Sequence, residues 1–598
     1  MLKALLHIIH INRWRITRIS KRNFLIYCSI VVGLIGGLAA VLLKYLVHVM
    51  EDVSRNISQR SPYHFTYVLL PAVGILLTVL YTHLVNRDQI QKGIGNLIFI
   101  IKRNNGNLKF NNLYSHLISS SLTVGFGGSS GLEAPIVCTG AAIGSNIGRF
   151  FKLTTHQKAI LLAAGASAGI AAVFNSPIAG VLFSLEIILG EISIPTFIPL
   201  LIASATGVVV AKALYSRQLF HLATEGWVMT ALPFYVLLGL FSGWMSIYIS
   251  KVAHKLEKGI FMKQNRYVRA AAGGVILGLM ILIFPPLLGE GYHYLQEVLN
   301  GNVDVLREET LFSSVLAHPW VMSAFIAALV FMKILAAGIT LGSGGNGGTF
   351  APTMFTGAFL GLFVAYTVNL TGIAHLNTIN FIAVGMAGAL AGVLHAPLTA
   401  IFLIAEITGG YVLFIPLMIV SAISYMVSRL SNKHNMYWQD LIHERQLYPD
   451  KDHEMLESIK LSSIINRNYV SVDKSKPLTE LYKLLAETDV NIFAVLNKDN
   501  RLEGVIWLDE VRRQLFGSTL PENAKIADVM VLPPAVVNFD QPADEVMDLF
   551  DSLDVWQLPV VRNERFIGFI SKSAILSKYR EVMIQQHQQS DFFGHNIN

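Results

Sequence analysis

The first 445 residues alternate between long apolar stretches and short polar ones. Apolar runs that approach or exceed the roughly 20 residues needed to cross a bilayer occur at 24–43, 68–84, 233–249, 270–288 and 381–404. Several of these runs contain Gly or Pro. Broken helices are tolerated in a membrane only where protein or water surrounds them. The pattern therefore predicts a polytopic bundle of membrane-spanning helices, some of which break within the bundle.

The pattern changes after residue 445. A polar linker at 446–457 leads into a region with no apolar run long enough to span a membrane. Two similar halves follow, at 458–517 and 521–581, and a polar tail occupies 582–598. Each half is typical of strand, helix, strand, turn, strand and helix. The sequence thus predicts an all-α membrane domain over 1–445 followed by a soluble pair of small α/β domains.

The membrane region also contains an internal repeat. The segment NSPIAGVLFSLEI at 175–187 aligns without a gap with HAPLTAIFLIAEI at 395–407. Small residues occupy similar positions upstream of both segments, as close helix packing in lipid requires. We expect a duplicated transport core with repeats at about 65–215 and 270–430. Repeats of this kind place an ion site near the membrane midplane, between broken helices of the two halves.

Two Gly-rich breaks recur in this core. GGSSGLEAP ends at Pro135 and GGNGGTFAP ends at Pro352, and an apolar helix is expected after each. Gly permits tight turns and close approach, and the free N–H groups of a helix start carry partial positive charge that binds anions. If the two helix starts converge, they form an anion site.

Three glutamates in the apolar region lie at positions that indicate a functional or a structural role. An ionisable residue within a membrane is a functional candidate by default, and Glu133 lies in the first break. Its carboxylate resembles the anion, so it suits a gate or a proton carrier; the alternative is a helix-capping role. Glu186 and Glu406 occupy matched positions of the repeat, which favours a shared structural role, such as accepting hydrogen bonds from free backbone N–H groups.

Composition narrows the function classes. The chain is 53% hydrophobic and only 14% charged, with a net charge of +7, which excludes an ordinary soluble protein. Basic residues flank the expected helices and crowd the first 23 positions, so membrane topology accounts for them without a nucleic-acid partner, and the N-terminus is expected to be cytoplasmic. Two cysteines and the absence of a phosphate loop, zinc spacing or nucleophile–base set predict neither a metal site nor enzyme activity.

These features resemble the CLC family of chloride channels and transporters over nearly the whole membrane region. The family motif G-x-E-x-P corresponds to residues 131–135, with Ala134 in place of the usual Gly, and G-x-F-x-P is complete at 348–352. The resemblance implies a homodimer with one anion pathway per subunit and no required cofactor. Compactness and the absence of long extracellular loops favour a plasma membrane, the bacterial inner membrane, with both termini cytoplasmic. The resemblance also implies that chloride contacts Leu132, Glu133, Ala134, Thr349, Phe350, Ala351 and the hydroxyl of Tyr437.

Two departures from the family pattern bear on the mechanism. Lys92 stands where a serine usually contacts the anion; it either adds positive charge to the pathway or extends to the membrane interface. Ile187 stands where proton-coupled members commonly carry a glutamate, and it cannot carry a proton. The proton pathway would then be limited to Glu133. We expect passive, channel-type conduction of chloride, with a proton-coupled chloride antiporter as the alternative.

The soluble tail resembles a pair of CBS domains, a module that often binds adenine nucleotides. Each half keeps part of the ligand signature, with Glu510 in the first half and Ser571 in the second. A structural, dimer-stabilising role and nucleotide sensing through these two residues both stay open. Two hypotheses belong to other functional classes. One is a CBS-bearing divalent-cation transporter, for which acidic pore residues are expected. The other is a membrane-anchored nucleotide sensor, which leaves the intramembrane repeat without a purpose.

Overall fold

The structure is a computed structural model of the chain, and its two compact units, Met1–Gln446 and Leu447–Asn598, are described separately. The residues that it describes are 20–60, 65–85, 93–190, 193–215, 226–257, 264–308, 310, 312–445, 455–456, 459–488, 490–508, 511–512 and 524–591.

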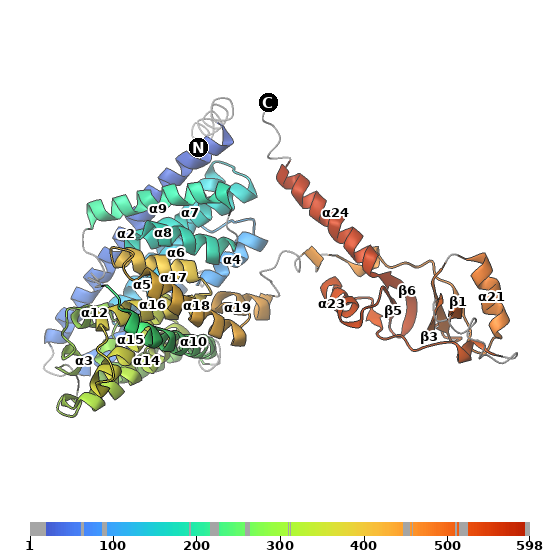
Figure 1. Cartoon of the computed structure of the whole chain (residues 1–598). Coiled ribbons are helices and arrows are strands. Elements are labelled where there is room, and N and C mark those ends of the chain that lie inside the picture. The colour runs from blue at the N-terminus through green and yellow to red at the C-terminus, as the bar shows by residue number, and fades with distance from the viewer. Residues whose placement is uncertain are drawn as a thin grey trace, which may run out of the picture. The chain divides into compact units, whose positions relative to one another are not determined.

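The first unit is built from helices, coloured from blue to ochre along the chain in Figure 1. Eight helical segments among the described residues are long and apolar enough to cross a membrane. In chain order the α-helices are α2 (Lys21–Arg60), α3 (Phe65–Leu84), α4 (Ile94–Arg103), α5 (Asn112–Gly125), α6 (Glu133–Phe150), α7 (Thr155–Phe174), α8 (Pro177–Phe183), α9 (Ile194–Leu214), α10 (Leu232–Lys255), α11 (Arg266–Ile283), α12 (Tyr292–Leu299), α13 (Val305–Glu308), α14 (Pro319–Gly342), α15 (Phe350–Thr371), α16 (Thr378–Leu394), α17 (Pro397–Ile407), α18 (Phe414–Ser431) and α19 (Met436–Arg445).

Proline decides where two of the apolar runs end as helices. The run at 381–404 is divided between α16 and α17, because Pro397 occupies the first position of the second helix and has no N–H to continue the first. The run at 270–288 stops being α-helical at Ile283, and Pro285 opens a short 3₁₀ turn. Hydrophobicity alone therefore predicts membrane depth but not helix ends.

Matched glycines bring two pairs of helices together, α6 against α7 and α15 against α16. A Cβ on Gly140 would lie 2.1 Å from the carbonyl oxygen of Gly165. The second pair repeats the contact, since a Cβ on Gly357 would lie 2.3 Å from the carbonyl oxygen of Gly385. Backbones this close leave no room for any side chain, as expected where helices associate by close packing in lipid.

Glu186 and Glu406 link the two repeats reciprocally. The carboxylate of Glu186, in the π-helical turn η1 (Ser184–Leu189) after α8, accepts hydrogen bonds from the start of α17, including 2.7 Å from the N–H and 2.6 Å from the hydroxyl of Thr399. The carboxylate of Glu406, in the last turn of α17, accepts from the start of α8, at 2.9 Å from the N–H of Ala179. Each glutamate satisfies helix-start donors, which confirms the structural role predicted for them.

The second unit contains two similar three-stranded sheets. In each, the first strand is parallel to the second and the second is antiparallel to the third. The sheet of the first half holds β1 (Ser471–Val472), β2 (Ile492–Leu496) and β3 (Leu502–Trp507) with α21 (Leu478–Glu487), and that of the second holds β4 (Val537–Asn538), β5 (Gln557–Arg562) and β6 (Arg565–Ser571) with α23 (Ala543–Leu553) and α24 (Lys572–Asp591).

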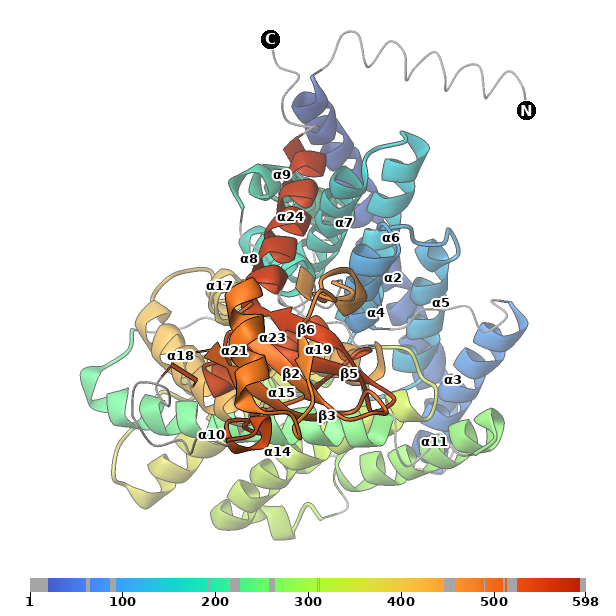
Figure 2. The same cartoon turned by 90° about the vertical axis from the view of Figure 1, so that its right-hand side faces the viewer.

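Apolar strands form the core of each half, and the two halves meet through backbone and side-chain contacts. All five residues of β2 are buried. Asn466 pairs with Phe569, and Arg501 forms an ion pair with Glu564 at 2.8 Å. The helix α24 continues ten residues past position 581, where the sequence predicts the polar tail to begin. Figure 2, turned by 90° about the vertical axis from Figure 1, labels α21, α23 and α24 and the strands β2, β3, β5 and β6 of this unit.

Candidate functional site

The two Gly-rich breaks lie side by side. Gly131 and Gly348 exchange a pair of backbone hydrogen bonds, at 2.9 Å and 2.8 Å. Two residues beyond each glycine a helix begins, α6 at Glu133 and α15 at Phe350. The free N–H groups of both helix starts are therefore brought into one region, where their partial positive charges add.

Glycine is required at these two positions by close approach. A Cβ on Gly131 would lie 2.0 Å from Oε2 of Glu133, and a Cβ on Gly348 would lie 2.8 Å from the Cβ of Ala134. Real Cβ contacts do not reach such distances, so a larger residue would displace the glutamate or separate the helix starts. The absence of a side chain at Gly131 thus leaves room for the carboxylate of Glu133.

Glu133 is buried at the start of α6, with only 1% of its surface exposed. Its Oε1 accepts a hydrogen bond of 3.1 Å from the hydroxyl of Tyr292. The carboxylate also interacts with backbone amides, its own and that of Ala351 at the start of α15. A carboxyl group therefore lies between the two helix starts, in the place where their N–H groups favour an anion.

The segment before α12 holds this region in place. Oε1 of Glu290 accepts the N–H of Leu132 at 3.2 Å. Lys333, on α14 and completely buried, donates to the carbonyl oxygens of Gly289 at 2.8 Å and of Leu287 at 3.3 Å. Sequence reasoning did not select these groups. A lysine inside the apolar run of α14 is the signal that could have found them, since an intramembrane charge needs partners.

The remaining predicted residues of the membrane unit fall into two groups. Leu132, Ala134, Thr349, Phe350 and Ala351 are all buried at the paired helix starts. Tyr437, near the start of α19, is 9% exposed, and its hydroxyl interacts with the side chain of Thr349 and electrostatically with Glu133. The structure therefore places Tyr437 beside the paired helix starts.

Of the two departures from the family pattern, Ile187 lies within the described residues and Lys92 does not. Ile187 is completely buried in the π-helical turn η1, where its side chain is part of the apolar packing. Lys92 lies outside the described residues, immediately before Gly93 at the start of α4.

The candidate nucleotide residues of the second unit are only partly placed. Ser571 ends β6, and its Oγ accepts the N–H of Ala574 at 3.2 Å, which caps the start of α24. Its Oγ also lies 3.1 Å from that of Ser573. Glu510 falls outside the described residues. The hydroxyl of Ser571 therefore already has a structural role.

Comparison with known proteins decides the family. A sequence model described as Voltage gated chloride channel matches residues 74–429, more than half of the chain. The chain belongs to the voltage-gated chloride channel family. It is thus a multi-pass membrane protein of a family that transports anions. Models of the CBS domain match residues 461–516 and 526–581, so the second unit is a CBS pair. The family and both parts of the predicted fold are confirmed.

Individual proteins match this chain at low sequence identity. A putative chloride channel protein, ClcB-like, from Ralstonia nicotianae is 28% identical over 434 residues, which cover 69% of this chain and 96% of the relative. The crystal structure of a slow cyanobacterial Cl−/H+ antiporter has a TM-score of 0.59 and 22% identity, covering 72% of this chain and 100% of the other. That of a eukaryotic CLC transporter has a TM-score of 0.59 and 16% identity, covering 93% and 99%. At these identities the two solved structures support the fold alone.

Proposed function

We propose that this chain is a homodimeric chloride channel with one anion pathway per subunit and with Glu133 as its gate. The pathway passes the paired starts of α6 and α15. Chloride contacts the backbone at 132–134 and 349–351, together with the hydroxyl of Tyr437. The protein works in a plasma membrane, as in the bacterial inner membrane, with both termini on the cytoplasmic side.

One observation carries the proposal: the buried carboxylate of Glu133 lies at the junction of two helix starts. The ionised carboxylate occupies the place that favours an anion, so chloride and Glu133 compete for the same N–H groups. A protonated carboxyl binds these donors less well, leaves them, and opens the pathway. Transport is then a matter of binding and side-chain movement, and it needs neither catalysis nor a cofactor.

Passive conduction is favoured by Ile187. An internal proton route needs ionisable side chains or water along it, and this buried apolar residue offers neither. Lys92, close in sequence to the start of α4, is proposed either to raise anion occupancy by its charge or to extend to the membrane interface. Membership of the family leaves the divalent-cation and sensor readings without support.

A proton-coupled chloride antiporter is the second candidate. The observation that favours it is that a solved structure of the same fold belongs to a Cl−/H+ antiporter. A proton route that avoids Ile187 would be required, and Glu133 would then carry the proton between the pathway and one side of the membrane.

For the CBS pair we propose a structural, dimer-stabilising role. The cap formed by Ser571 at the start of α24 supports this role, because it gives the hydroxyl oxygen a structural use. Binding of an adenine nucleotide by Glu510 and Ser571 is the alternative.

Flux measurements on the purified protein test the proposal. Liposomes with a chloride gradient are monitored for chloride efflux and external pH together, with and without a proton uncoupler. We expect chloride efflux without stoichiometric proton movement. For Glu133→Gln, which resembles the protonated gate, we expect chloride flux that no longer depends on pH.

The control is Glu297→Gln, which removes a partly exposed carboxylate from α12 and should leave the pH dependence intact. Proton uptake matched to chloride efflux would replace the channel by the antiporter. Persistence of the pH dependence in Glu133→Gln would remove Glu133 as the gate.

A further inference from the structure

We propose that Thr123 and Thr340 are positioning residues for the anion site: their hydroxyls tie the two Gly-rich breaks together and so set the separation of the starts of α6 and α15. This inference rests on the proposed anion site at the two helix starts and adds two residues that act through the backbone of the breaks. Thr123 lies in the last turn of α5, which precedes the first break, and Thr340 in the last turn of α14, which precedes the second.

The two threonines occupy the same position in a repeat that includes both breaks. TVGFGGSSGLEAP at 123–135 aligns without a gap with TLGSGGNGGTFAP at 340–352, and seven of the thirteen positions are identical. Each threonine stands ten residues before the first residue of the helix that follows its break. Ser129 of the first break corresponds to Asn346 of the second. The two halves therefore offer matched groups to each other.

The threonine hydroxyls cross between the halves. Oγ1 of Thr123 accepts the N–H of Asn346 in the second break at 3.0 Å, and Oγ1 of Thr340 accepts the N–H of Ser129 in the first break at 3.1 Å. All four residues are buried. A buried N–H needs an acceptor within the protein, because water does not reach it. One N–H of each break therefore depends on a threonine of the other half.

The threonine hydroxyls are the acceptors in these two contacts, because a backbone N–H can only donate. Each hydroxyl also donates its own proton to a carbonyl oxygen four residues earlier in its helix, to Ser119 at 3.0 Å from Thr123 and to Ala336 at 2.8 Å from Thr340. The hydroxyl of Thr123 lies in addition 2.8 Å from that of Thr78 on α3. A valine side chain has nearly the same shape as threonine but has no lone pair, so it cannot accept the N–H of the opposite break.

Each break is held at three points. Near its start, the carbonyl oxygen of its own threonine accepts an N–H, that of Gly128 at 2.8 Å for Thr123 and that of Gly345 at 3.0 Å for Thr340. In its middle, it is bound by the hydroxyl of the opposite threonine. Two residues before its helix, it is bound by the backbone pair of glycines. The crossed hydroxyl bonds thus fix the two breaks, and with them the two helix starts, relative to each other.

A fixed separation of the helix starts has a direct consequence for anion binding. The partial charge of a helix start acts over the first turn only, and a hydrogen bond weakens steeply when its angle becomes unfavourable. Loss of one crossed bond leaves a buried N–H beside a methyl group, which is unfavourable, and the break shifts to relieve this. The donors of one helix start then no longer fit the same anion as those of the other. Chloride affinity therefore depends on both threonines.

Conservative variants separate the hydroxyl of each threonine from its shape. Thr123→Val and Thr340→Val keep the branched side chain and remove the acceptor. Thr123→Ser and Thr340→Ser keep the acceptor and remove a buried methyl group. All are made in full-length Glu133→Gln, the parent protein, in which no ionised carboxylate competes with chloride. Chloride binding to the purified proteins is measured by isothermal titration calorimetry, and thermal unfolding is recorded in parallel.

We expect each valine variant to bind chloride about five- to tenfold more weakly than the parent, the factor that corresponds to one net hydrogen bond. Each serine variant should bind chloride as the parent does, although the lost methyl group lowers its unfolding temperature. The control Thr206→Val removes a hydroxyl of α9 that donates to a carbonyl oxygen four residues earlier and lies in neither break. Its chloride affinity should equal that of the parent.

Unchanged chloride affinity in either valine variant overturns the proposal and leaves the threonines a purely structural role. A serine variant that binds chloride as weakly as its valine counterpart has the same meaning. If a valine variant fails to fold, Thr123→Ala or Thr340→Ala is compared with the serine variant at the same position, from which it differs by the hydroxyl alone. Equal chloride affinities in that pair overturn the proposal, and a weaker affinity in the alanine variant supports it.

Failure of this inference is distinguishable from failure of the proposed function. Chloride binding by the parent together with unchanged affinity in the valine variants removes only the role of the threonines. Chloride binding by neither the wild type nor Glu133→Gln removes the anion site at the helix starts, and the inference falls with it.

Discussion

The starts of α6 and α15 have the same backbone arrangement but carry different first side chains. Each follows a glycine of the same backbone pair, and each begins with a residue followed by Ala-Pro. The first residue is Glu133 in one and Phe350 in the other. Glu133 is bound by Tyr292, whereas Phe350 packs with its ring 5.7 Å from that of Phe174. Under our proposal, both helix starts can bind an anion, and one side chain makes only the first a titratable gate.

The pair Glu186 and Glu406 is the opposite case, in which the two halves keep the same residue for the same role. Here both halves keep the same residue, and both carboxylates accept hydrogen bonds from a helix start in the opposite half. The residues shared by the halves carry the architecture, as do the matched glycines of the helix pairs. The residues that differ are the ones to which we assign function. The predictions below test this division.

The largest effect is expected for glycine at the helix contacts. Leu at Gly165 or at Gly385 must displace a backbone carbonyl that lies 1.9 Å or 2.3 Å from an added Cβ. Overpacking of this kind destabilises by about 3 kcal/mol or more. We expect both variants to lose folded protein, measured by size-exclusion chromatography in detergent.

A matched control is Gly410→Leu, because no atom lies within 4 Å of a Cβ at Gly410. This variant should remain folded. If one of the two core variants folded normally while the other did not, the helix packing of the two halves would not be equivalent. The claim that residues shared by the halves carry the architecture would then be wrong.

A smaller, graded effect is expected at the reciprocal caps. Alanine at Glu186 or at Glu406 leaves helix-start N–H groups, most of them partly buried, without their acceptor, which typically destabilises by about 1–3 kcal/mol. Glu186 also accepts from the hydroxyl of Thr399. We therefore expect Glu186→Ala to be the more destabilised, by about 1 kcal/mol, in thermal unfolding of the detergent-solubilised protein.

The variant Thr399→Val checks the origin of that difference. In this background the losses at Glu186 and Glu406 should become similar. A larger loss at Glu406 in the wild-type background would contradict the assignment of the additional hydrogen bond.

The architecture could be predicted because apolar runs and repeats can be identified directly from the order of residues in the sequence. The breaks ending at Pro135 and Pro352 could be read from Gly and Pro alone, and the capping role of Glu186 followed from its match in the other half. The partners of Glu133 could not be predicted. Tyr292 on α12 and Glu290 just before it contact residues 132 and 133 through tertiary packing, and Lys333 on α14 binds the segment that carries Glu290. No spacing in the sequence relates these residues to 131–135.

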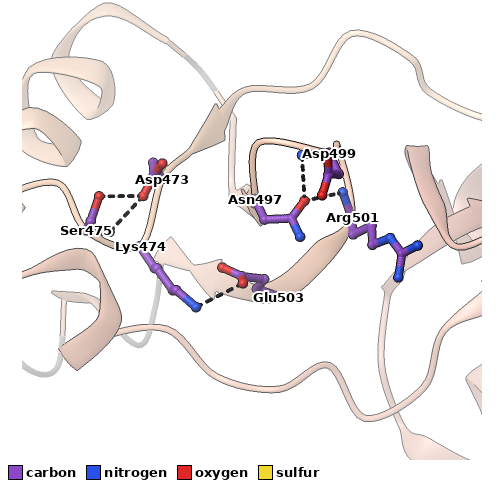
Figure 3. Close-up of polar contacts among 7 residues, drawn as sticks. All are labelled: Asp473, Lys474, Ser475, Asn497, Asp499, Arg501 and Glu503. Atoms are coloured by element: carbon purple, nitrogen blue, oxygen red, sulfur yellow. Dashed lines mark hydrogen bonds and ion pairs between the residues drawn. The ribbon is translucent and has the colours of Figure 1, made fainter.

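The smallest effect is expected in the CBS pair, whose two halves also use different residues for one turn. Between β1 and α21, the carboxylate of Asp473 accepts from the N–H of Ser475 at 2.9 Å and from its hydroxyl at 2.7 Å (Figure 3). Between β4 and α23, the N–H of Asn538 donates instead to the side chain of Gln541 at 3.2 Å. The hydrogen bonds from Ser475 lower the pKa of Asp473, so the first turn is pH-sensitive by this route.

The sign of the pH effect follows from that lowered pKa. Asp473 contributes stability above its unfolded pKa of about 3.9, and the contribution is lost as the pH falls through the lower folded value. Ser475→Ala should therefore unfold at a lower temperature than wild type at pH 7, and the difference should shrink at pH 3. Calorimetry of the full-length protein measures both. Ser552→Ala, which removes a hydroxyl bonded to the carbonyl of Leu549, should give a difference independent of pH, and an equally constant difference for Ser475→Ala would remove Asp473 as the cause.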